Sequence, residues 1–142
     1  TQLARGRGAY VVATVSSASF DLARELGAHE VLERTGDAWV EALARVDLVF
    51  DTVGGDALAR SAAELGSGAR LVSIAGEPAE GVGTYFVVEP SRAQLVEVAA
   101  LVDSGLVRPA IDSVFPLSEA QAAFDRVAAS DKRGKVVLRV AA

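Results

Sequence analysis

Apolar runs of strand length alternate with helical patterns along the chain. The run at 9–15 is continuous and rich in β-branched residues, which is typical of a strand buried on both faces. The predicted strands cover residues 9–15, 30–33, 46–51, 70–75, 85–88 and 135–140. Because helical segments separate these strands, we expect βαβ units and a parallel sheet with right-handed crossovers.

Helical periodicity marks the segments between the predicted strands. After Asp56, the residues Leu58, Ala62 and Leu65 recur at i, i+4 and i+7, and the pattern stops at Gly66. The apolar faces of the other predicted helices consist of Leu22, Ala23 and Leu26; of Val40, Leu43 and Ala44; of Leu95, Val98, Ala99 and Val102; and of Ala120, Ala123, Phe124 and Val127. We expect these faces to pack against the sheet.

Composition places the chain among globular proteins. Of its 142 residues, 51% are hydrophobic and 23% are charged, which is enough apolar material for one packed domain or part of one. The chain has no cysteine and a single histidine, His29, so neither a disulfide framework nor a thiolate or multi-histidine metal site is expected.

Charge and hydropathy exclude two further classes of partner. The formal net charge of −5 argues against binding to the phosphate backbone of a nucleic acid, because no basic stripe is present. No apolar run approaches the roughly 18 residues that a membrane span requires. No export signal opens the chain. We therefore expect a cytoplasmic protein with no nucleic-acid or membrane partner.

The carboxyl ends of three predicted strands are rich in small and hydroxyl-bearing residues. These ends are Thr14–Ser17, Asp51–Gly55 and Ser73–Gly76. In an open parallel sheet, ligands bind beyond the carboxyl ends of the strands, and small residues let a flat or phosphorylated ligand approach the backbone. The pattern predicts a nucleotide-type α/β domain, although any one loop could equally be a tight turn that needs glycine.

Six segments of the chain, taken together and in order, resemble the medium-chain dehydrogenase/reductase superfamily. The nearest branch is the quinone oxidoreductase-like one, which lacks zinc. The segments are 2–17, 26–31, 49–56, 68–75, 114–124 and 133–139. The resemblance extends over essentially the whole chain.

This resemblance implies a Rossmann-like parallel sheet with helices on both faces. Residues 1–142 would form a partial dinucleotide-binding domain that includes a C-terminal return segment at 111–142. The opening residues read as the last turn of a helix, so the first, central strand, its Gly-rich turn and an N-terminal GroES-like catalytic domain are expected to be absent. The strands at 9–15 and 46–51 would then lack their common neighbour. We expect the chain alone to be poorly stable and inactive.

The end of the first predicted strand favours NADPH over NADH as the cofactor. NAD-binding enzymes place a carboxylate at the end of the second Rossmann strand, whereas this strand ends in Ser16 and Ser17, with no carboxylate until Asp21. The alternative is that the two serines cap the next helix. Arg34 and Lys135 are candidate partners for the 2′-phosphate, and each is equally a surface cation.

The resemblance also implies a nicotinamide-binding region and a dimer. The residues implied at the nicotinamide are Thr52, Val53, Gly54, Ile74, Ala75, Phe86 and Val87. The strand at Tyr85–Val88 would pair with a second copy in a homodimer, which would protect an apolar edge. We expect Asp51 to be structural, His29 to form a surface pair with Glu30, and Trp39 to pack in the core.

The sequence as a whole predicts the cofactor-binding portion of an NADPH-dependent oxidoreductase. Its substrate would be an electrophilic small molecule, a quinone or an α,β-unsaturated carbonyl compound, that receives hydride. No catalytic residue and no metal ligand is assigned within the chain. Two alternatives remain: the cofactor domain of a zinc-dependent alcohol dehydrogenase, and a non-catalytic module for nucleotide binding or dimerisation.

Overall fold

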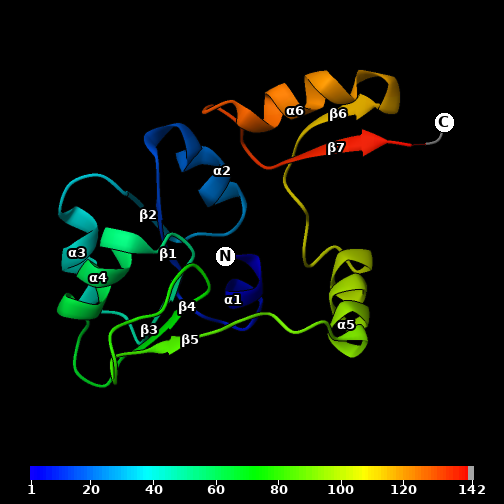
Figure 1. Cartoon of the computed structure of the whole chain (residues 1–142). Helices are drawn as coiled ribbons and strands as arrows, with labels where there is room; N and C mark the ends of the chain where they lie inside the picture. The colour runs from blue at the N-terminus through cyan, green and yellow to red at the C-terminus, as the bar shows by residue number, and fades with distance from the viewer. Residues whose placement is uncertain (141–142) are drawn as a thin grey trace. The chain divides into compact units, whose positions relative to one another are not determined.

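The computed structural model describes residues 1–140, which form two compact units (Figure 1). The first unit comprises Thr1–Val31 together with the chain from Arg92 onward, and the second comprises Leu32–Ser91. The expected return segment at 111–142 belongs to the first unit, and its last two residues lie outside the described part.

The helices and strands occur in the alternating order that the periodicity predicts. The helices are α1 (Gln2–Gly6), α2 (Phe20–Glu25), α3 (Ala38–Leu43), α4 (Gly55–Glu64), α5 (Arg92–Asp103) and α6 (Ala120–Ala128). The strands are β1 (Val12–Val15), β2 (Glu30–Glu33), β3 (Leu48–Asp51), β4 (Arg70–Ser73), β5 (Thr84–Tyr85), β6 (Ile111–Pro116) and β7 (Lys135–Arg139). Five of the six predicted strands are present, the sixth, predicted at 85–88, is reduced to β5 at Thr84–Tyr85, and β6 is an additional strand that the pattern does not predict.

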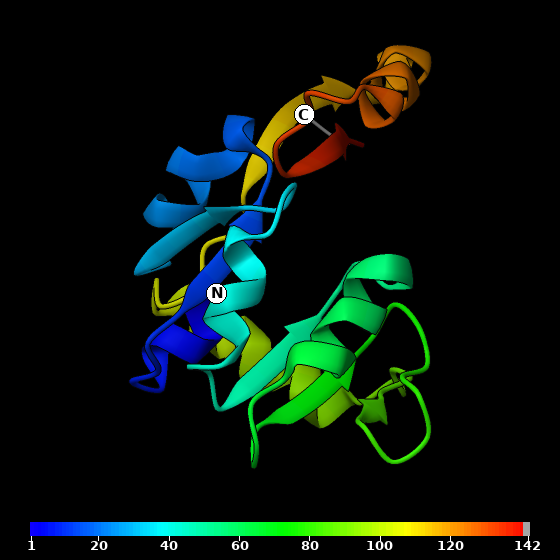
Figure 2. The same cartoon turned by 90° about the vertical axis from the view of Figure 1, so that its left-hand side faces the viewer.

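The second unit is built on a parallel sheet in the order β3–β4–β5. Strands β3 and β4 pair from Leu48 opposite Arg70 to Asp51 opposite Ser73. Helices α3 and α4 lie side by side next to these strands (Figure 2). The core of the unit is apolar and consists of Trp39, Ala42, Leu43, Leu58 and Leu71.

The first unit contains the parallel pair β6–β7, along which α6 lies (Figure 1). Strand β1 also belongs to this unit and pairs with β2, whose residues Glu30 and Val31 are the last of the unit's early segment. Two contacts of His29 are with residues other than Glu30: its Nδ1 accepts a hydrogen bond from the Val11 N–H at 3.0 Å, and its ring stacks on Tyr10. The side chain therefore fastens the start of β1 to the turn before β2.

The α/β class with parallel strands is confirmed, but the strands do not form one continuous sheet. Within residues 1–140 the strands fall into three separate sheets, β1–β2, β3–β4–β5 and β6–β7. Successive side chains of a strand point to opposite faces of the sheet, so Leu48 and Phe50 lie on the same face of β3. Both side chains are at least half exposed.

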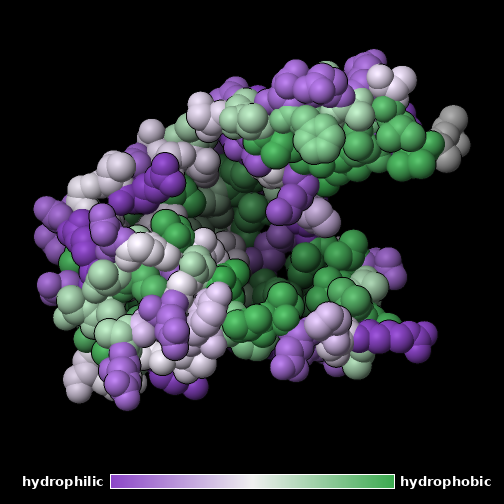
Figure 3. Space-filling model, viewed as in Figure 1, coloured by the Kyte–Doolittle hydropathy of each residue, from purple (hydrophilic) through white to green (hydrophobic). Residues whose placement is uncertain are grey.

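Helix α5 departs most from the predicted packing. Its apolar residues, among them Leu95, Val98 and Val102, form the expected face, yet no residue of the helix is buried. Figure 3 shows hydrophobic surface over this helix. The periodicity correctly identifies the apolar face, but it does not determine whether another element covers it. No helix among the described residues is long and apolar enough to cross a membrane.

Candidate functional site

A buried carboxylate and a buried hydroxyl join the carboxyl ends of β3 and β4. Asp51 lies opposite Ser73 in the ladder, and the Ser73 Oγ donates a hydrogen bond of 2.7 Å to Asp51 Oδ2. Asp51 is 7% exposed and Ser73 is 0% exposed. The register of β3 and β4 places the Asp51 and Ser73 side chains together, and their hydrogen bond links the two loops that follow these strands.

The same two side chains also bind the backbone of both loops. The Asp51 carboxylate accepts hydrogen bonds from the N–H groups of Val53 and Gly54 at 3.1–3.2 Å. The Ser73 Oγ accepts bonds from the N–H groups of Ala75 and Gly76, each at 3.2 Å. The acceptor capacity of Asp51 is therefore used within the protein, and the expected structural role of this residue is confirmed.

Gly54 is required where the two loops meet. Its φ of 74° and ψ of −165° lie in a region that side-chain-bearing residues rarely adopt. A Cβ at this position would also lie 3.1 Å from the carbonyl oxygen of Ala75. Only glycine allows both the backbone conformation and the close approach of the neighbouring loop.

The loops expose side chains at the carboxyl edge of the sheet. Thr52 and Ala75 are exposed, Val53 is 64% exposed and Ile74 is 45% exposed, whereas Gly54 is buried. These five predicted site residues lie together because β3 and β4 are adjacent and parallel. The pair of loops thus offers a small apolar surface next to a rigid backbone.

Phe86 and Val87 reach the same edge, although they do not lie in a strand as predicted. Strand β5 ends at Tyr85, one residue earlier, and the Phe86 N–H then donates a hydrogen bond of 2.8 Å to the Ser73 carbonyl. The ladder between β4 and β5 comprises the pairs Val72–Thr84 and Ser73–Tyr85. Both side chains are exposed.

A cavity of about 440 Å³ lies next to the loops, between α4 and the segment that follows β4. Gly55 and Gly76, which border the two loops, contribute to its wall. Most of the other lining is small or apolar and consists of Leu58, Ala59, Ala62, Ala63, Pro78, Ala79 and Val82, with Glu77 as the charged member. An uncharged organic group fits this environment.

The remaining predicted cofactor residues are distributed between the two units. Ser16 and Ser17 follow β1 in the first unit, and the Ser16 hydroxyl lies 3.4 Å from the Ser19 hydroxyl. Ser16 is the N-cap residue of the short 3-10 helix Ser17–Ser19, although its side chain makes no capping hydrogen bond. Arg34 is exposed just after β2, in the second unit.

Lys135 begins β7 in the first unit, and its N–H donates to the Ala110 carbonyl at 2.8 Å. Its side chain is exposed. Within residues 1–140, no hydrogen bond or ion pair joins Lys135 to Ser16 or Ser17. The structure therefore does not bring Lys135 into contact with the two serines.

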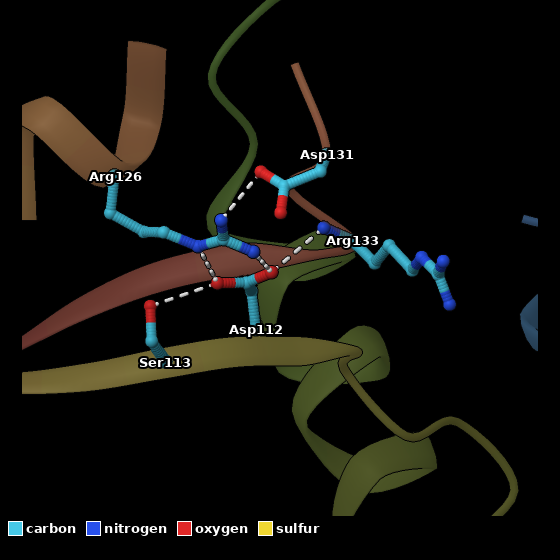
Figure 4. Close-up of polar contacts among 5 residues, drawn as sticks. All are labelled: Asp112, Ser113, Arg126, Asp131 and Arg133. Atoms are coloured by element: carbon cyan, nitrogen blue, oxygen red, sulfur yellow. Dashed lines mark hydrogen bonds and ion pairs between the residues drawn. The ribbon is translucent and has the colours of Figure 1, made fainter. Parts of the chain in front are cut away.

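A second polar cluster, which the sequence analysis does not identify, joins β6, α6 and the loop before β7 (Figure 4). The Arg126 guanidinium donates two hydrogen bonds to Asp112, at 2.6 and 2.7 Å, and a third to Asp131. Asp112 also accepts from the Arg133 N–H at 2.8 Å and from the Ser113 hydroxyl. These residues are far apart in sequence, so only the fold reveals their contact.

The hydrogen bonds and charges of this cluster stabilise the ionised form of the Asp112 carboxylate and the charged form of the Arg126 guanidinium. The hydrogen bonds from Arg126, followed by the bond from the Arg133 N–H, hold the pKa of Asp112 well below its ordinary value, against the opposing effect of burial. The same pairing raises the pKa of Arg126. Asp112 therefore contributes stability that is fully present above its ordinary pKa of 3.8 and is lost as the pH falls below it.

This dependence predicts how an Asp112→Asn variant behaves. Its melting temperature is expected to lie below that of the unchanged chain at pH 7 and pH 5, and the difference should shrink progressively from about pH 4 downward. Thermal unfolding between pH 7 and pH 2 measures this difference. Asp125→Asn, which removes an exposed carboxylate of α6, serves as the control and should differ little at any pH. A difference that stays constant down to pH 2 would contradict the role of the Asp112 charge.

Comparison with known proteins agrees with this architecture. A family profile described as zinc-binding dehydrogenase matches residues 26–138, which is most of the chain. The chain belongs to the zinc-binding dehydrogenase family. This membership confirms the resemblance to the medium-chain dehydrogenase/reductase superfamily.

Relatives of this family match nearly the whole chain. A probable mitochondrial zinc-binding oxidoreductase of Arthroderma benhamiae is 32% identical over 92% of the chain and 44% of its own length. A chloroplastic NADPH-dependent alkenal/one oxidoreductase of Arabidopsis thaliana is 28% identical over 90% of the chain and 33% of its own length. The solved quinone oxidoreductase of Coxiella burnetii superimposes with a TM-score of 0.84 and 27% identity, over 99% of the chain and 48% of that structure. The chain thus spans between a third and a half of these relatives.

The family description names zinc, whereas several relatives use a nicotinamide cofactor, and the described residues fit these two groups differently. No group of three or more His, Cys, Asp or Glu side chains within residues 1–140 is arranged to hold a metal ion. The described residues therefore do not fit a zinc ion. The exposed Val53 and Ile74 beside a fixed backbone do fit the flat ring of a nicotinamide. The Arabidopsis relative and a mitochondrial NAD(P)H oxidoreductase of Danio rerio, which is 28% identical over 98% of the chain and 45% of its own length, carry NADPH or NAD(P)H in their names, which agrees with a nicotinamide cofactor.

Proposed function

We propose that this chain supplies the cofactor-binding part of an oxidoreductase that uses NADPH to reduce a quinone or an α,β-unsaturated carbonyl compound. The proposal rests on the pair of loops after β3 and β4. Asp51 and Ser73 bind the backbone of these loops through hydrogen bonds, and the side chains of Val53 and Ile74 are exposed beside them. The names of the Arabidopsis and Coxiella relatives support the same chemistry.

In this proposal the chain positions the cofactor and excludes water from it. NADPH supplies the hydride when it is bound. Val53 and Ile74, both exposed at the loops, would hold the nicotinamide ring, and the loop backbone that Asp51 and Ser73 fix would limit its motion. The apolar cavity beside α4 accommodates an uncharged part of the substrate. No described residue is assigned to proton transfer, because the one buried carboxylate at the loops is engaged by backbone and hydroxyl donors.

The preference for NADPH rests on the end of β1 and on Arg34. Ser16 and Ser17 place hydroxyl groups, and no carboxylate, where NAD-binding enzymes have an acid for the ribose 2′-hydroxyl. Arg34, exposed after β2, supplies a guanidinium that suits a phosphate. A carboxylate would repel a 2′-phosphate, whereas a hydroxyl can donate a hydrogen bond to it and a guanidinium carries the opposite charge.

Thermal unfolding of the chain with each nucleotide tests this preference. We expect NADPH to raise the melting temperature more than NADH does, because a ligand that binds the folded state alone stabilises it. Ser17→Asp and Arg34→Gln are each expected to weaken NADPH binding roughly tenfold and to leave NADH binding nearly unchanged.

Arg70→Gln provides a matched loss of charge at the amino end of β4, away from the loops, and should not alter either response. Equal stabilisation by the two nucleotides would exclude the phosphate preference. A lack of response to either one would exclude cofactor binding by this chain. Oxidation of NADPH by the chain with an enone or quinone would show that it is active alone, contrary to expectation.

We also propose that a second copy pairs along β5. This strand is the last in the order β3–β4–β5, and the residues that follow it, Phe86, Val87 and Val88, are exposed. An unpaired apolar edge invites another strand. Sedimentation equilibrium is expected to give twice the chain mass, and a monomer at all concentrations would refute the pairing.

A further inference from the structure

Away from the candidate site, the first unit contains a small cavity with a lining that is partly charged and partly apolar. It has a volume of about 260 Å³ and lies between α2 and the segments that lead into β6 and β7. Its charged lining consists of Glu25, Arg108 and Arg133, and its apolar lining includes Leu22, Leu26 and Ile111. This combination is typical of sites for small amphipathic molecules.

Hydrogen bonds within the unit fix the backbone of both arginines. The Arg108 N–H donates to Gln2 Oε1, and Gln2 Nε2 donates to the Arg108 carbonyl, each at 2.8 Å. The Arg133 N–H donates to Asp112, which the Arg126 guanidinium in turn holds. The fold therefore sets the positions from which both side chains extend, and little ordering of the backbone remains for a ligand to impose.

The two guanidinium groups differ in their partners. Arg108 is paired with Glu25 at 2.5 Å. The Arg133 guanidinium forms no hydrogen bond or ion pair with any other described residue, and Figure 4 shows its side chain extending away from Asp112. Two arginines and one glutamate leave the cavity with one net positive charge, in a chain whose net charge is −5.

We propose that this cavity binds a small organic monoanion, a carboxylate carried on a compact apolar group. The planar guanidinium of Arg133 matches a carboxylate through two parallel N–H···O bonds. Leu22, Leu26 and Ile111 would cover the apolar part of the ligand. The single net positive charge suits a monoanion better than a phosphate dianion. This inference does not rest on the proposed oxidoreductase function, because the cavity and the loops after β3 and β4 belong to different units.

Ligand-observed NMR on the full chain tests the proposal with benzoate as the probe. Benzyl alcohol has the same ring without the charge, and inorganic phosphate has the charge without the ring. We expect saturable binding of benzoate and at least tenfold weaker binding of both other compounds. Absence of saturable benzoate binding, or equal binding of benzyl alcohol, would overturn the proposal.

Variants then assign the binding to Arg133. Arg133→Gln is expected to weaken benzoate binding at least tenfold. Arg133→Lys should retain part of the affinity, because lysine keeps the positive charge but lacks the two parallel N–H donors of the guanidinium. Lys132→Gln removes a neighbouring charge that does not line the cavity and should have little effect. Unchanged affinity in Arg133→Gln would overturn the assignment.

The substitution at Arg133 leaves the Asp112 cluster intact, since Arg133 contributes its backbone N–H to that cluster. Far-UV circular dichroism verifies that the variant is folded. If it is not, Ile111→Glu offers an independent test: Ile111 is half exposed on β6, and a carboxylate there should abolish benzoate binding by repulsion. Benzoate that still binds the Ile111→Glu variant would count against the cavity as its site.

Discussion

Replacing Asp51 with alanine is expected to lower the free energy of unfolding by about 2–4 kcal/mol, because it leaves buried donors without an acceptor. The affected donors are the N–H groups of Val53 and Gly54 and the hydroxyl of Ser73. Ser73 is fully buried, so water cannot replace the lost carboxylate at its hydroxyl. Urea unfolding followed by the fluorescence of the single tryptophan, Trp39, reports on the same unit.

Two comparisons make this experiment specific. Asp56→Ala removes an exposed carboxylate from the first turn of α4 and should cost less than about 1 kcal/mol. Ser73→Ala combined with Asp51→Ala should cost less than the sum of the two single changes, because both side chains belong to one network. Strict additivity, or an effect of Asp51→Ala no larger than that of Asp56→Ala, would rule out the coupling of the two loops.

Replacing Leu71 with alanine is expected to destabilise the chain by about 2–5 kcal/mol, as is usual for a leucine truncated in a packed core. Leu71 lies on the central strand β4 and is only 2% exposed. Gly83 packs so closely that a Cβ there would lie 3.0 Å from the Leu71 Cβ. The surrounding backbone leaves little freedom to collapse into the space, so most of the cavity should persist.

Leu48→Ala is the matched control for this change. Leu48 lies on the adjacent strand β3 but is 50% exposed, so its truncation removes much less buried surface and should cost under about 1 kcal/mol. Urea midpoints of the two variants, compared at equal slope, measure the difference. A similar loss of unfolding free energy in both variants would mean that Leu71 on β4 is not at the centre of the core.

The regular part of the fold could be predicted from local pattern because strand and helix periods differ. The segment from Asp56 to Gly66 shows this well, since its apolar spacing predicts a helix at almost the observed position of α4. The loops at the candidate site were also predictable, because ligands bind at the carboxyl ends of parallel strands. The hydrogen bond between Asp51 and Ser73 could not be predicted by either rule, because it depends on the register in which β3 and β4 pair.

Long-range contacts account for what the pattern missed. Strand β6 mixes polar and apolar residues and ends at Pro116, so its strand character depends on pairing with β7. The cluster of Asp112, Arg126 and Asp131 likewise needs the fold to bring its members together. Helix α5 shows the opposite case, in which a correct apolar face has no cover among the described residues.

The division of the chain into two units has a consequence for the order of folding during synthesis. The second unit, Leu32–Ser91, is continuous in sequence, whereas the first consists of an early and a late segment. A ribosome that releases the chain from its amino end completes the second unit while the late half of the first is still unmade. The β3–β4 pairing can therefore form early, and β6, α6 and β7 can complete the first unit only after the second unit has been synthesised.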